Sequence, residues 1–373
     1  MQRLSITPRP AWRAQVEAQG LLYHDQYYTE SAAYVFSEAE ILHIEKATAE
    51  IFEHSLAVVE YIIKHSLWDE FRIPRQYAAW IAQSWKEDAP SFYGRMDLAV
   101  TPEGSIKLLE FNADTPTSLL EAAVVQWQWL QDHRPVADQY NSIHERLLEH
   151  MRSCKADFHG PLHFACVADS EEDYLTVKYL EDVATQAGIR TAFTHMHDIG
   201  VSETGAFIAG DGLPVSNVFK LYPWEWMMQE EFGPDLITKA GLGTLWIEPP
   251  YKAILSNKML LVYLHKLFPD SAYLLPAQAD VAPVYDHVRK PILGREGSNT
   301  AIITAGKSLE ETGGEYGGEG FIYQQYTPLP DFDGWHPVIG SWLIGGVPSG
   351  MGIRESRSRI TDNKSQFVPH YFE

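Results

Sequence analysis

The sequence predicts a mixed protein, α/β and α+β, with a helical N-terminal part, an α/β middle and a C-terminal lobe rich in antiparallel strands. Three observations lead to this prediction. Apolar residues at helical spacing follow capping patterns in the first part of the chain, short apolar strands then alternate with helical segments, and strands separated by glycine loops occupy the last part. No internal repeat and no low-complexity linker divides these regions.

The N-terminal part is predicted to contain a long helix over residues 37–67. Ser37 and Glu40 form a capping-box pattern. Apolar residues then recur near helical spacing as far as Ile63. Two further helices are predicted, one from the capping-box pair Ser118 and Glu121 through Trp127 to Leu130, whose tryptophans we expect in the core, and one over 143–151.

The middle and the C-terminal part alternate between strand and helix signals before becoming strand-rich. Residues 163–169 and 215–222 read as strands, and residues 171–188 between them read as a helix. This order is typical of an α/β arrangement. Beyond residue 285, strands are predicted at 288–293, 301–305, 321–326, 336–344 and 350–355.

Composition excludes several classes of protein. The chain has 373 residues, a formal net charge of -21 and 45% hydrophobic residues, which is typical of a soluble globular protein and not of a disordered chain, collagen or a coiled coil. The acidity is spread along the chain without clustered Lys or Arg, so we expect no nucleic-acid partner. The negative charge would serve either solubility or the attraction of cationic amines.

Targeting and redox signals are equally sparse. No apolar run approaches the roughly 18 to 20 residues of a membrane helix, and the first residues lack the apolar core of a signal peptide, so we expect no membrane partner. Cys154 and Cys166 lack metal-ligand spacing, and we expect two buried free thiols. The predicted compartment is the cytoplasm.

The most informative segment is 93–118, where a turn at Glu103 and Gly104 joins two predicted strands. Pairing across that turn sets Asp97 opposite Glu110 and Arg95 opposite Asn112; it also predicts the pairs Leu98 with Leu109 and Val100 with Lys107. Because side chains alternate between faces, one face would carry the apolar residues Met96, Leu98, Val100, Leu109 and Phe111, and the other the polar residues Arg95, Asp97, Glu110 and Asn112.

The polar face of this hairpin suggests a cation site. Two carboxylates directly opposite each other repel. Arg95 would relieve part of that repulsion, and Mg²⁺ would relieve it better, since it prefers carboxylate, amide and phosphate oxygens. Asp97, Glu110 and Asn112 supply that oxygen set, although an ordinary solvated hairpin face remains open from the hairpin alone. The polar turn 113–118 then leads into a helix start, which suits a carboxylate or phosphate.

Lysines and glycine loops in the C-terminal part suit a nucleotide. Lys258 and Lys290 are followed by a loop with Gly294, Gly297 and Ser298 that can bring backbone N–H groups to phosphates. The loop matches neither a Walker A nor a Rossmann fingerprint, and an ordinary hairpin loop remains open. Arg354 on a predicted strand could equally form a surface ion pair.

Taken together, these segments resemble the glutathionylspermidine synthase family. The motifs RMD, LLEFNADTPTS, DSEED, FKLYPWEW, SNK, RKPILGREGSN, IYQQY and GIRE occur in that family's order along essentially the whole chain. The resemblance is closest to the short bacterial members without an amidase domain, described as acid–amine ligases. It implies an ATP-grasp fold with a helical region and metal-binding hairpin at 1–155, an α/β subdomain at 156–250 and a nucleotide lobe at 251–373, together one synthetase unit.

The resemblance also implies roles for single residues, with ATP and Mg²⁺ as cofactors. The Mg²⁺ ligands would be Asp97, Glu110 and Asn112; the ATP-binding residues Lys258, Lys290, Gly297, Ser298, Gln324, Gln325 and Tyr326; the arginine at the transferring phosphoryl group Arg354; and the residues holding a glutathione-like peptide Arg95, Thr115, Thr117, Glu171 and Glu172. One departure concerns that peptide: the family's Lys-Thr-Trp segment here has Leu221 after Lys220.

The function expected from these residues is ATP- and Mg²⁺-dependent ligation of a small acid, which could be a glutathione-like peptide, to an amine, which could be a polyamine, through an acyl phosphate. Two alternatives stay open: a non-catalytic nucleotide or peptide binder on the same scaffold, and a glycoside hydrolase with Asp97 and Glu110 as its carboxylate pair.

Overall fold

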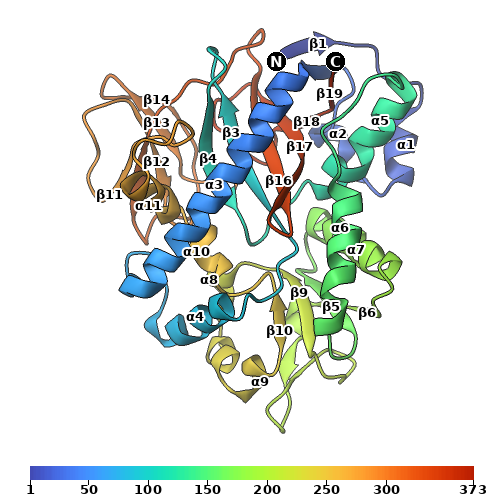
Figure 1. Ribbon diagram of the computed structural model, residues 1–373, viewed down its shortest axis with the longest axis vertical. Helices are drawn as coiled ribbons and strands as arrows, with labels where there is room; N and C mark the ends of the chain where they lie inside the picture. Colours follow the sequence, from blue (N-terminus) through green and yellow to red (C-terminus); the bar gives the residue numbers. More distant parts are fainter.

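The computed structural model describes the backbone of residues 1–373 and all side chains except those of Gln26, Ala240 and Leu242. Its strands form two five-stranded sheets, one four-stranded sheet, one three-stranded sheet and one two-stranded ribbon. Figure 1 shows the four-stranded sheet at the bottom of the molecule, the two five-stranded sheets above it, and both chain termini at the top.

A central antiparallel sheet in the order β18–β17–β16–β3–β4 joins residues from both halves of the chain. Its strands are β3 (Tyr93–Val100), β4 (Ile106–Asn112), β16 (His336–Ile344), β17 (Val347–Ser356) and β18 (Gln366–Val368). The long helix α3 (Glu38–His65) crosses one face of this sheet (Figure 1) and contacts β4, β16 and β17. The predicted capping box of Ser37 and Glu40 at the start of α3 is confirmed.

A second antiparallel sheet, in the order β11–β15–β12–β13–β14, lies beside the central one. The helix α11 (Met259–Leu267) packs against β11 and β15, and the short helix α10 (Lys252–Leu255) precedes it. The strands β12 to β18 are therefore antiparallel as predicted, with β16 to β18 in the central sheet, whereas the last strand, β19 (His370–Phe372), pairs in parallel with β2 (Ala32–Phe36). The strands of the second sheet are β11 (Ala277–Ala279), β12 (His287–Pro291), β13 (Ala301–Thr304), β14 (Lys307–Glu311) and β15 (Phe321–Gln325).

The α/β middle forms a parallel sheet in the order β10–β9–β5–β6. Its strands are β5 (Leu162–Cys166), β6 (Thr191–His195), β9 (Asn217–Leu221) and β10 (Leu245–Ile247). The predicted alternation of strand, helix and strand is confirmed, with α7 between β5 and β6. The helices within this region are α7 (Glu171–Gln186), α8 (Trp224–Met227) and α9 (Lys239–Leu242), while α6 (Ile143–Cys154) comes shortly before β5 in the chain and α4 (Ala78–Lys86) comes before β3.

The remaining elements bring the two ends of the chain together. Strand β2 lies between β1 and the last strand, β19, so the termini are adjacent in Figure 1. These elements are β1 (Gln2–Ser5), β2 (Ala32–Phe36), β19 (His370–Phe372), the helices α1 (Trp12–Ala18) and α2 (His24–Tyr27), and the ribbon of β7 (Gly200–Val201) and β8 (Phe207–Ile208).

The predicted helix at 118–130 exists, but its capping box is wrong. Ser118 adopts a left-handed backbone conformation, and no side-chain cap forms at this helix start. The helix begins at Leu119, passes through a π-helical turn at Glu121–Val125 and continues as α5 (Gln126–His133). Trp129 is fully buried as predicted, whereas Trp127 is 41% exposed, so its core placement is wrong.

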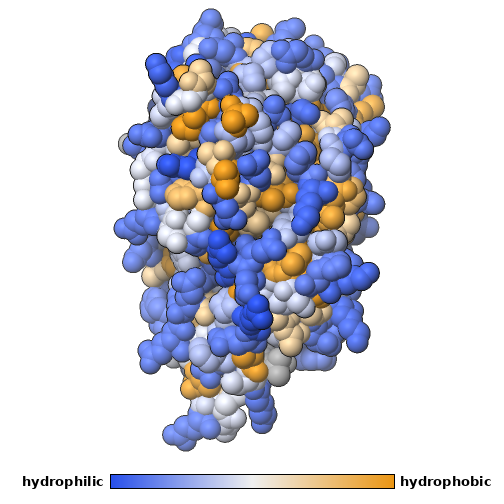
Figure 2. Space-filling view, turned by 90° about the vertical axis from the view of Figure 1, so that its left-hand side faces the viewer, coloured by the Kyte–Doolittle hydropathy of each residue, from blue (hydrophilic) through white to orange (hydrophobic). Residues whose placement is uncertain are grey.

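The surface and the thiols agree with the sequence. Cys154 and Cys166 are buried and free, as predicted. Figure 2 shows mostly hydrophilic residues on the face it presents, with hydrophobic groups in small patches. Among the described residues, no helix combines the length and apolar character needed to cross a membrane.

Candidate active site

The hairpin of β3 and β4 carries the predicted polar face, with one change of register. Asp97 pairs with Glu110 and Arg95 with Asn112, as predicted. A β-bulge after Asp97 then shifts the pairing, so Leu98 lies opposite Leu108 and Val100 opposite Ile106. The predicted pairs Leu98 with Leu109 and Val100 with Lys107 are therefore wrong.

The bulge also exchanges two leucines between the faces of the hairpin. Leu108 is fully buried in the core under α3, with Met96, Leu98 and Phe111. Leu109 lines a cavity on the other side, next to Glu110. The predicted apolar position of Leu109 is thus wrong, because the extra residue turns its side chain toward the polar face.

Asp97 is held by two arginines, one from its own strand β3 and one from β17. Arg95 Nε lies 2.7 Å from one carboxylate oxygen of Asp97. Arg354 Nη2, from β17, lies 2.8 Å from the other carboxylate oxygen. The Asp97 side chain is only 5% exposed. The like-charge repulsion expected between Asp97 and Glu110 is therefore offset on the Asp97 side by two guanidinium groups.

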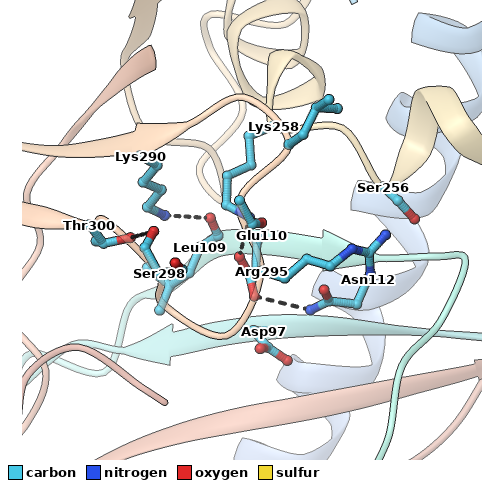
Figure 3. Close-up of polar contacts among 12 residues, drawn as sticks. Asp97, Leu109, Glu110, Asn112, Ser256, Lys258, Lys290, Arg295, Ser298 and Thr300 are labelled. Atoms are coloured by element: carbon cyan, nitrogen blue, oxygen red, sulfur yellow. Dashed lines mark hydrogen bonds and ion pairs between the residues drawn. The ribbon is translucent and has the colours of Figure 1, made fainter. Parts of the chain in front are cut away.

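Glu110 is held in turn by lysines and by Asn112. Lys258 Nζ lies 3.0 Å from the carboxylate, and Asn112 Nδ2 donates a hydrogen bond to it at 3.1 Å (Figure 3). Burial alone would raise the pKa of Glu110, but the charges of Lys258 and Lys290 and the hydrogen bond from Asn112 hold that pKa well below its usual range. Glu110 is thus an anion facing two cations.

Lys290 reaches the same region from β12. Its Nζ donates to the Leu109 carbonyl and to Gln324 Oε1, both at 2.8 Å. The pKa of Lys290 is lowered to about 8. Burial is the main cause, the charge of Glu110 opposes it, and the charge of Lys258 adds to it. Gln324 Nε2 also donates to the Leu108 carbonyl. Gln324 therefore holds Lys290 against the bulge of β4.

A cavity of about 780 Å³ opens between the second sheet and the hairpin. Two lysines and two carboxylates line it, together with polar side chains and with apolar side chains from β12, β13 and β16. Its lining includes all the predicted nucleotide-binding residues: Lys258, Lys290, Gly297, Ser298, Gln324, Gln325 and Tyr326. A cavity that combines apolar side chains with cations suits a nucleotide.

The glycine loop that follows β12 is tightly placed. Gly297 has a φ of +68°, and a Cβ at this position would lie 2.5 Å from the Thr361 carbonyl oxygen. Thr312 Oγ1 donates to the Gly297 carbonyl, and Asn299 N donates to the carbonyl of Gly313. The loop at 294–299 and the glycine-rich segment at 312–320 are therefore hydrogen-bonded to each other.

A second cavity, of about 1320 Å³, lies on the other side of the carboxylate pair. It shares Asp97, Glu110, Gly297 and Thr361 with the first cavity. Three arginines line one part of it: Arg95, Arg295 and Arg354. Acidic side chains line another part: Glu172, Asp173 and Glu296. The third part is an apolar wall from β9 and α8, formed by Leu221, Pro223 and Trp226. The two carboxylates thus stand where the cavities meet.

The predicted peptide-binding residues are mostly found in this second cavity. Arg95, Thr115, Thr117 and Glu172 line it, whereas Glu171 is exposed and does not. Its neighbour Asp173 lines the cavity instead, and burial together with the charge of Glu172 raises the pKa of Asp173 to about 6.

Two features of the second cavity were not predicted from the sequence. Arg295, in the glycine loop, forms an ion pair with Glu225 at 2.7 Å and donates to Thr115 Oγ1 at 2.6 Å. The second feature is the apolar wall, which includes Trp226, a residue that is 40% exposed. A basic residue within a glycine loop was the available signal for Arg295, and the clustered aromatics at 222–226 were the signal for the wall.

The oxygen set at the junction fits a hard divalent cation. Among the described side chains, no three His, Cys, Asp or Glu groups converge as a metal site, so a cation here would have two carboxylates and the Asn112 amide as protein ligands. That is the set Mg²⁺ uses when phosphate oxygens complete its coordination. A cation would also replace part of the charge that Arg95, Arg354 and Lys258 now supply to these carboxylates.

Comparison with known proteins identifies relatives of this chain. A family model described as "Glutathionylspermidine synthase preATP-grasp" matches residues 3–373. A Haemophilus influenzae protein named "Putative acid--amine ligase" is 40% identical, covering 93% of this chain and 91% of that protein. Trypanothione synthetase of Crithidia fasciculata is 29% identical over 94% of this chain, and the bifunctional glutathionylspermidine synthetase/amidase of Escherichia coli is 27% identical over 96%.

The chain spans only part of the two longer relatives, 54% of the trypanothione synthetase and 62% of the bifunctional enzyme. Among solved structures, a glutathione synthetase-like effector from Globodera pallida aligns over 98% of both chains with a TM-score of 0.58 and 11% sequence identity. At that identity the likeness concerns the fold alone, and it agrees with the predicted ATP-grasp-type architecture.

Proposed function

The chain belongs to the glutathionylspermidine synthase family of carbon–nitrogen ligases, and from this membership and the geometry of the site we propose that it is an ATP- and Mg²⁺-dependent acid–amine ligase. The reaction would join the carboxylate of a small acid to an amine as an amide, with ATP converted to ADP and phosphate.

One observation carries this proposal: two cavities meet at Asp97 and Glu110. The first is lined by Lys258 and Lys290 together with apolar side chains, as a nucleotide with its phosphates requires. The second is wide and polar, with arginines beside acidic groups. Phosphoryl transfer from a nucleotide to an acid needs the two reactants on either side of such a junction.

The first step would be attack of the acid's carboxylate oxygen on the γ-phosphorus, breaking the bond to the β-phosphate oxygen and giving an acyl phosphate and ADP. Lys258 and Lys290 would hold the phosphates, and Arg354 and Arg95 the carboxylate and the transferring group. Mg²⁺, bound by Asp97, Glu110 and Asn112, would neutralise charge on the phosphate oxygens. Catalysis would then rest on positioning and electrostatics.

The second step would be attack of a neutral amine on the acyl carbon, expelling phosphate and leaving the amide after loss of one proton. The acidic side chains Glu172 and Asp173 suit binding of the amine as an ammonium cation, which would release a first proton to become the neutral nucleophile before the attack. The hydrogen-bonded segments 294–299 and 312–320 would keep water from the acyl phosphate.

The identity of the acid is narrowed by the apolar wall of the second cavity. Relatives are named for glutathionylspermidine and trypanothione, so a glutathione-like peptide and a polyamine are the first pair to test. Leu221, Pro223 and Trp226 also favour acids that carry an apolar group on this side.

The proposal is tested by incubating the protein with ATP, Mg²⁺ and panels of acids and amines, and detecting ADP and the amide by mass spectrometry. Turnover should require all four components. Asp97→Asn should lower turnover by at least about 100-fold, because charge stabilisation at the transferring group is lost. Asp132→Asn, which alters an Arg–Asp pair distant from both cavities, should leave turnover unchanged.

Two results would contradict this assignment. Full turnover by Asp97→Asn would remove the metal role of Asp97. Nucleotide binding without ADP formation for every pair of substrates would favour the non-catalytic binder on the same scaffold. Magnesium-dependent binding of ATP would itself exclude the glycoside hydrolase.

A further inference from the structure

The turn after β4 separates two residues with proposed roles. Asn112, a proposed metal ligand, and Thr115, a proposed acid contact, both line the second cavity. Between them, Ala113 and Asp114 are fully buried. The position of Asn112 relative to Thr115 therefore depends on what holds these two buried residues.

Asp114 is held at both carboxylate oxygens. Lys220 Nζ, from β9, lies 2.6 Å from Oδ1, and the backbone N–H of Trp224 donates to Oδ2 at 2.9 Å. Neither the lysine nor the carboxylate is exposed. Lys220 also donates to the Tyr222 carbonyl at 2.9 Å and lies 4.1 Å from the centre of the Trp224 ring. The ion pair of Asp114 and Lys220 is therefore buried, and both of its side chains have further hydrogen-bond partners.

Ala113 is held from the opposite direction. Its N–H donates to Ser256 Oγ at 3.0 Å, and its carbonyl accepts from Lys252 Nζ at 3.2 Å. Lys252 also donates to the Tyr93 carbonyl, at the start of β3, and lies 3.2 Å from Glu248. Two buried lysines from separate elements therefore bind the same two-residue turn.

We propose that Asp114 and Lys220 are positioning residues for the ligase reaction: their buried ion pair sets Asn112 against the carboxylate pair and fixes Thr115 beside the wall formed by Leu221 and Pro223. The inference rests on the proposed function. Its physical basis is that a buried ion pair adds little net stability compared with apolar packing, whereas it defines one geometry for the groups it joins. Here the joined groups are the end of the metal-binding hairpin and the wall of the acid cavity.

The pair also explains how the α/β sheet is registered against the central sheet. Lys220 belongs to β9, and the next residues, Leu221 and Tyr222, line the second cavity. Asp114 follows β4 by two residues. A change in the Asp114–Lys220 distance would therefore move the acid-binding wall and the metal-binding hairpin relative to each other.

The test measures how much Mg²⁺ strengthens binding of the non-hydrolysable nucleotide AMP-PNP, by isothermal titration calorimetry with and without Mg²⁺. In the wild type, Mg²⁺ should tighten binding, and the gain from Mg²⁺ is the ratio of the AMP-PNP affinity with Mg²⁺ to the affinity without it. In Asp114→Asn, the metal-free affinity should persist, because Lys258 and Lys290 are untouched, while the gain from Mg²⁺ should fall about tenfold, equivalent to about 1.4 kcal/mol. A merely structural role would lower the melting temperature without changing this ratio.

Two further variants keep the test decisive. Glu30→Gln removes a charge from another buried pair, with Arg9, and should lower the melting temperature while leaving the gain from Mg²⁺ unchanged. Ser256→Ala removes a single hydrogen bond to Ala113 and should reduce the gain about threefold; it replaces Asp114→Asn if that variant does not fold.

The outcomes separate the two proposals. Folded Asp114→Asn, or Ser256→Ala in its place, with the full gain from Mg²⁺ would overturn the positioning role alone. A wild-type protein whose nucleotide affinity did not respond to Mg²⁺ would overturn the metal assignment in the proposed function, and the positioning role with it. A reduced gain in the Asp114 variant beside an unchanged gain in Glu30→Gln would support both.

Discussion

The buried acids of the candidate site are paired with cations, whereas among the described residues the buried acid Glu121 has no cationic partner. Asp97, Glu110 and Asp114 each meet at least one cation within 3.0 Å. Glu121 has no such partner: it is fully buried, Oε1 accepts from Tyr23 at 2.8 Å, and Oε2 has no hydrogen-bond partner among the described residues. Unpaired burial of this kind favours the neutral acid.

The protonation of Glu121 should make stability depend on pH. Burial, aided by the charge of Glu172, raises its pKa to about 7. Because the folded-state pKa exceeds the unfolded one, the neutral acid stabilises the fold at low pH, and this contribution is lost as pH rises through about 7. Glu121→Gln, which mimics the neutral acid, should therefore stabilise the protein at about pH 8 by on the order of 3 kcal/mol, and by almost nothing near about pH 4.

Thermal and urea unfolding at several pH values would measure this effect. Glu53→Gln on the exposed face of α3 is the matched control and should not change the pH dependence. Equal stabilisation of Glu121→Gln at both ends of the pH range would show that Glu121 is ionised, or neutral, throughout.

At the scale of elements, the glycine loop after β12 is constrained by a single close approach. Gly297 has a left-handed φ of +68° and no room for a Cβ beside Thr361. Gly297→Ala should move the loop away from the phosphate positions and weaken AMP-PNP binding by at least about tenfold, since the left-handed backbone alone costs about 1 to 2 kcal/mol. Calorimetry against the wild type measures the change.

A matched glycine separates this effect from a general cost of substitution. Gly200, in the β7–β8 ribbon, has open space at its Cβ position and no left-handed φ. Gly200→Ala should bind AMP-PNP as the wild type does. If Gly297→Ala retained wild-type affinity, the loop would not contact the phosphates.

The elements also show how far sequence reasoning reached. Capping at Ser37, the turn at Gly104 and the pairing of Asp97 with Glu110 follow local rules, and each was predictable. The bulge that exchanges Leu108 and Leu109 was not, because it depends on long-range contacts: Lys290 and Gln324 bind the carbonyls of these two residues from the second sheet. The failed cap at Ser118 has a similar origin, since Arg95 donates to the Thr117 carbonyl and to Ser118 Oγ.

At the scale of the whole molecule, the site is assembled from distant parts of the chain. Arg354 on β17 reaches Asp97 on β3 because both strands belong to the central sheet and only β16 separates them. The cavities on either side draw on the α/β sheet and on the second antiparallel sheet. Motifs indicated each component, but the pairing of β16 with β3 is a tertiary choice that no local pattern encodes.

The whole molecule also carries a formal net charge of -21, and this charge should influence capture of the amine. An acidic protein attracts a cationic amine over distances comparable to the Debye length, which falls from about 30 Å at 0.01 M salt to about 8 Å at 0.15 M. For a polyamine, kcat/KM should therefore fall several-fold across this range. An amine that is uncharged at the assay pH should show almost no change, and the two slopes, measured with the same acid and saturating ATP, isolate the electrostatic part. Equal slopes for both amines would mean that Glu172 and Asp173 do not receive the amine as a cation, and that the acidity of the chain serves only its solubility.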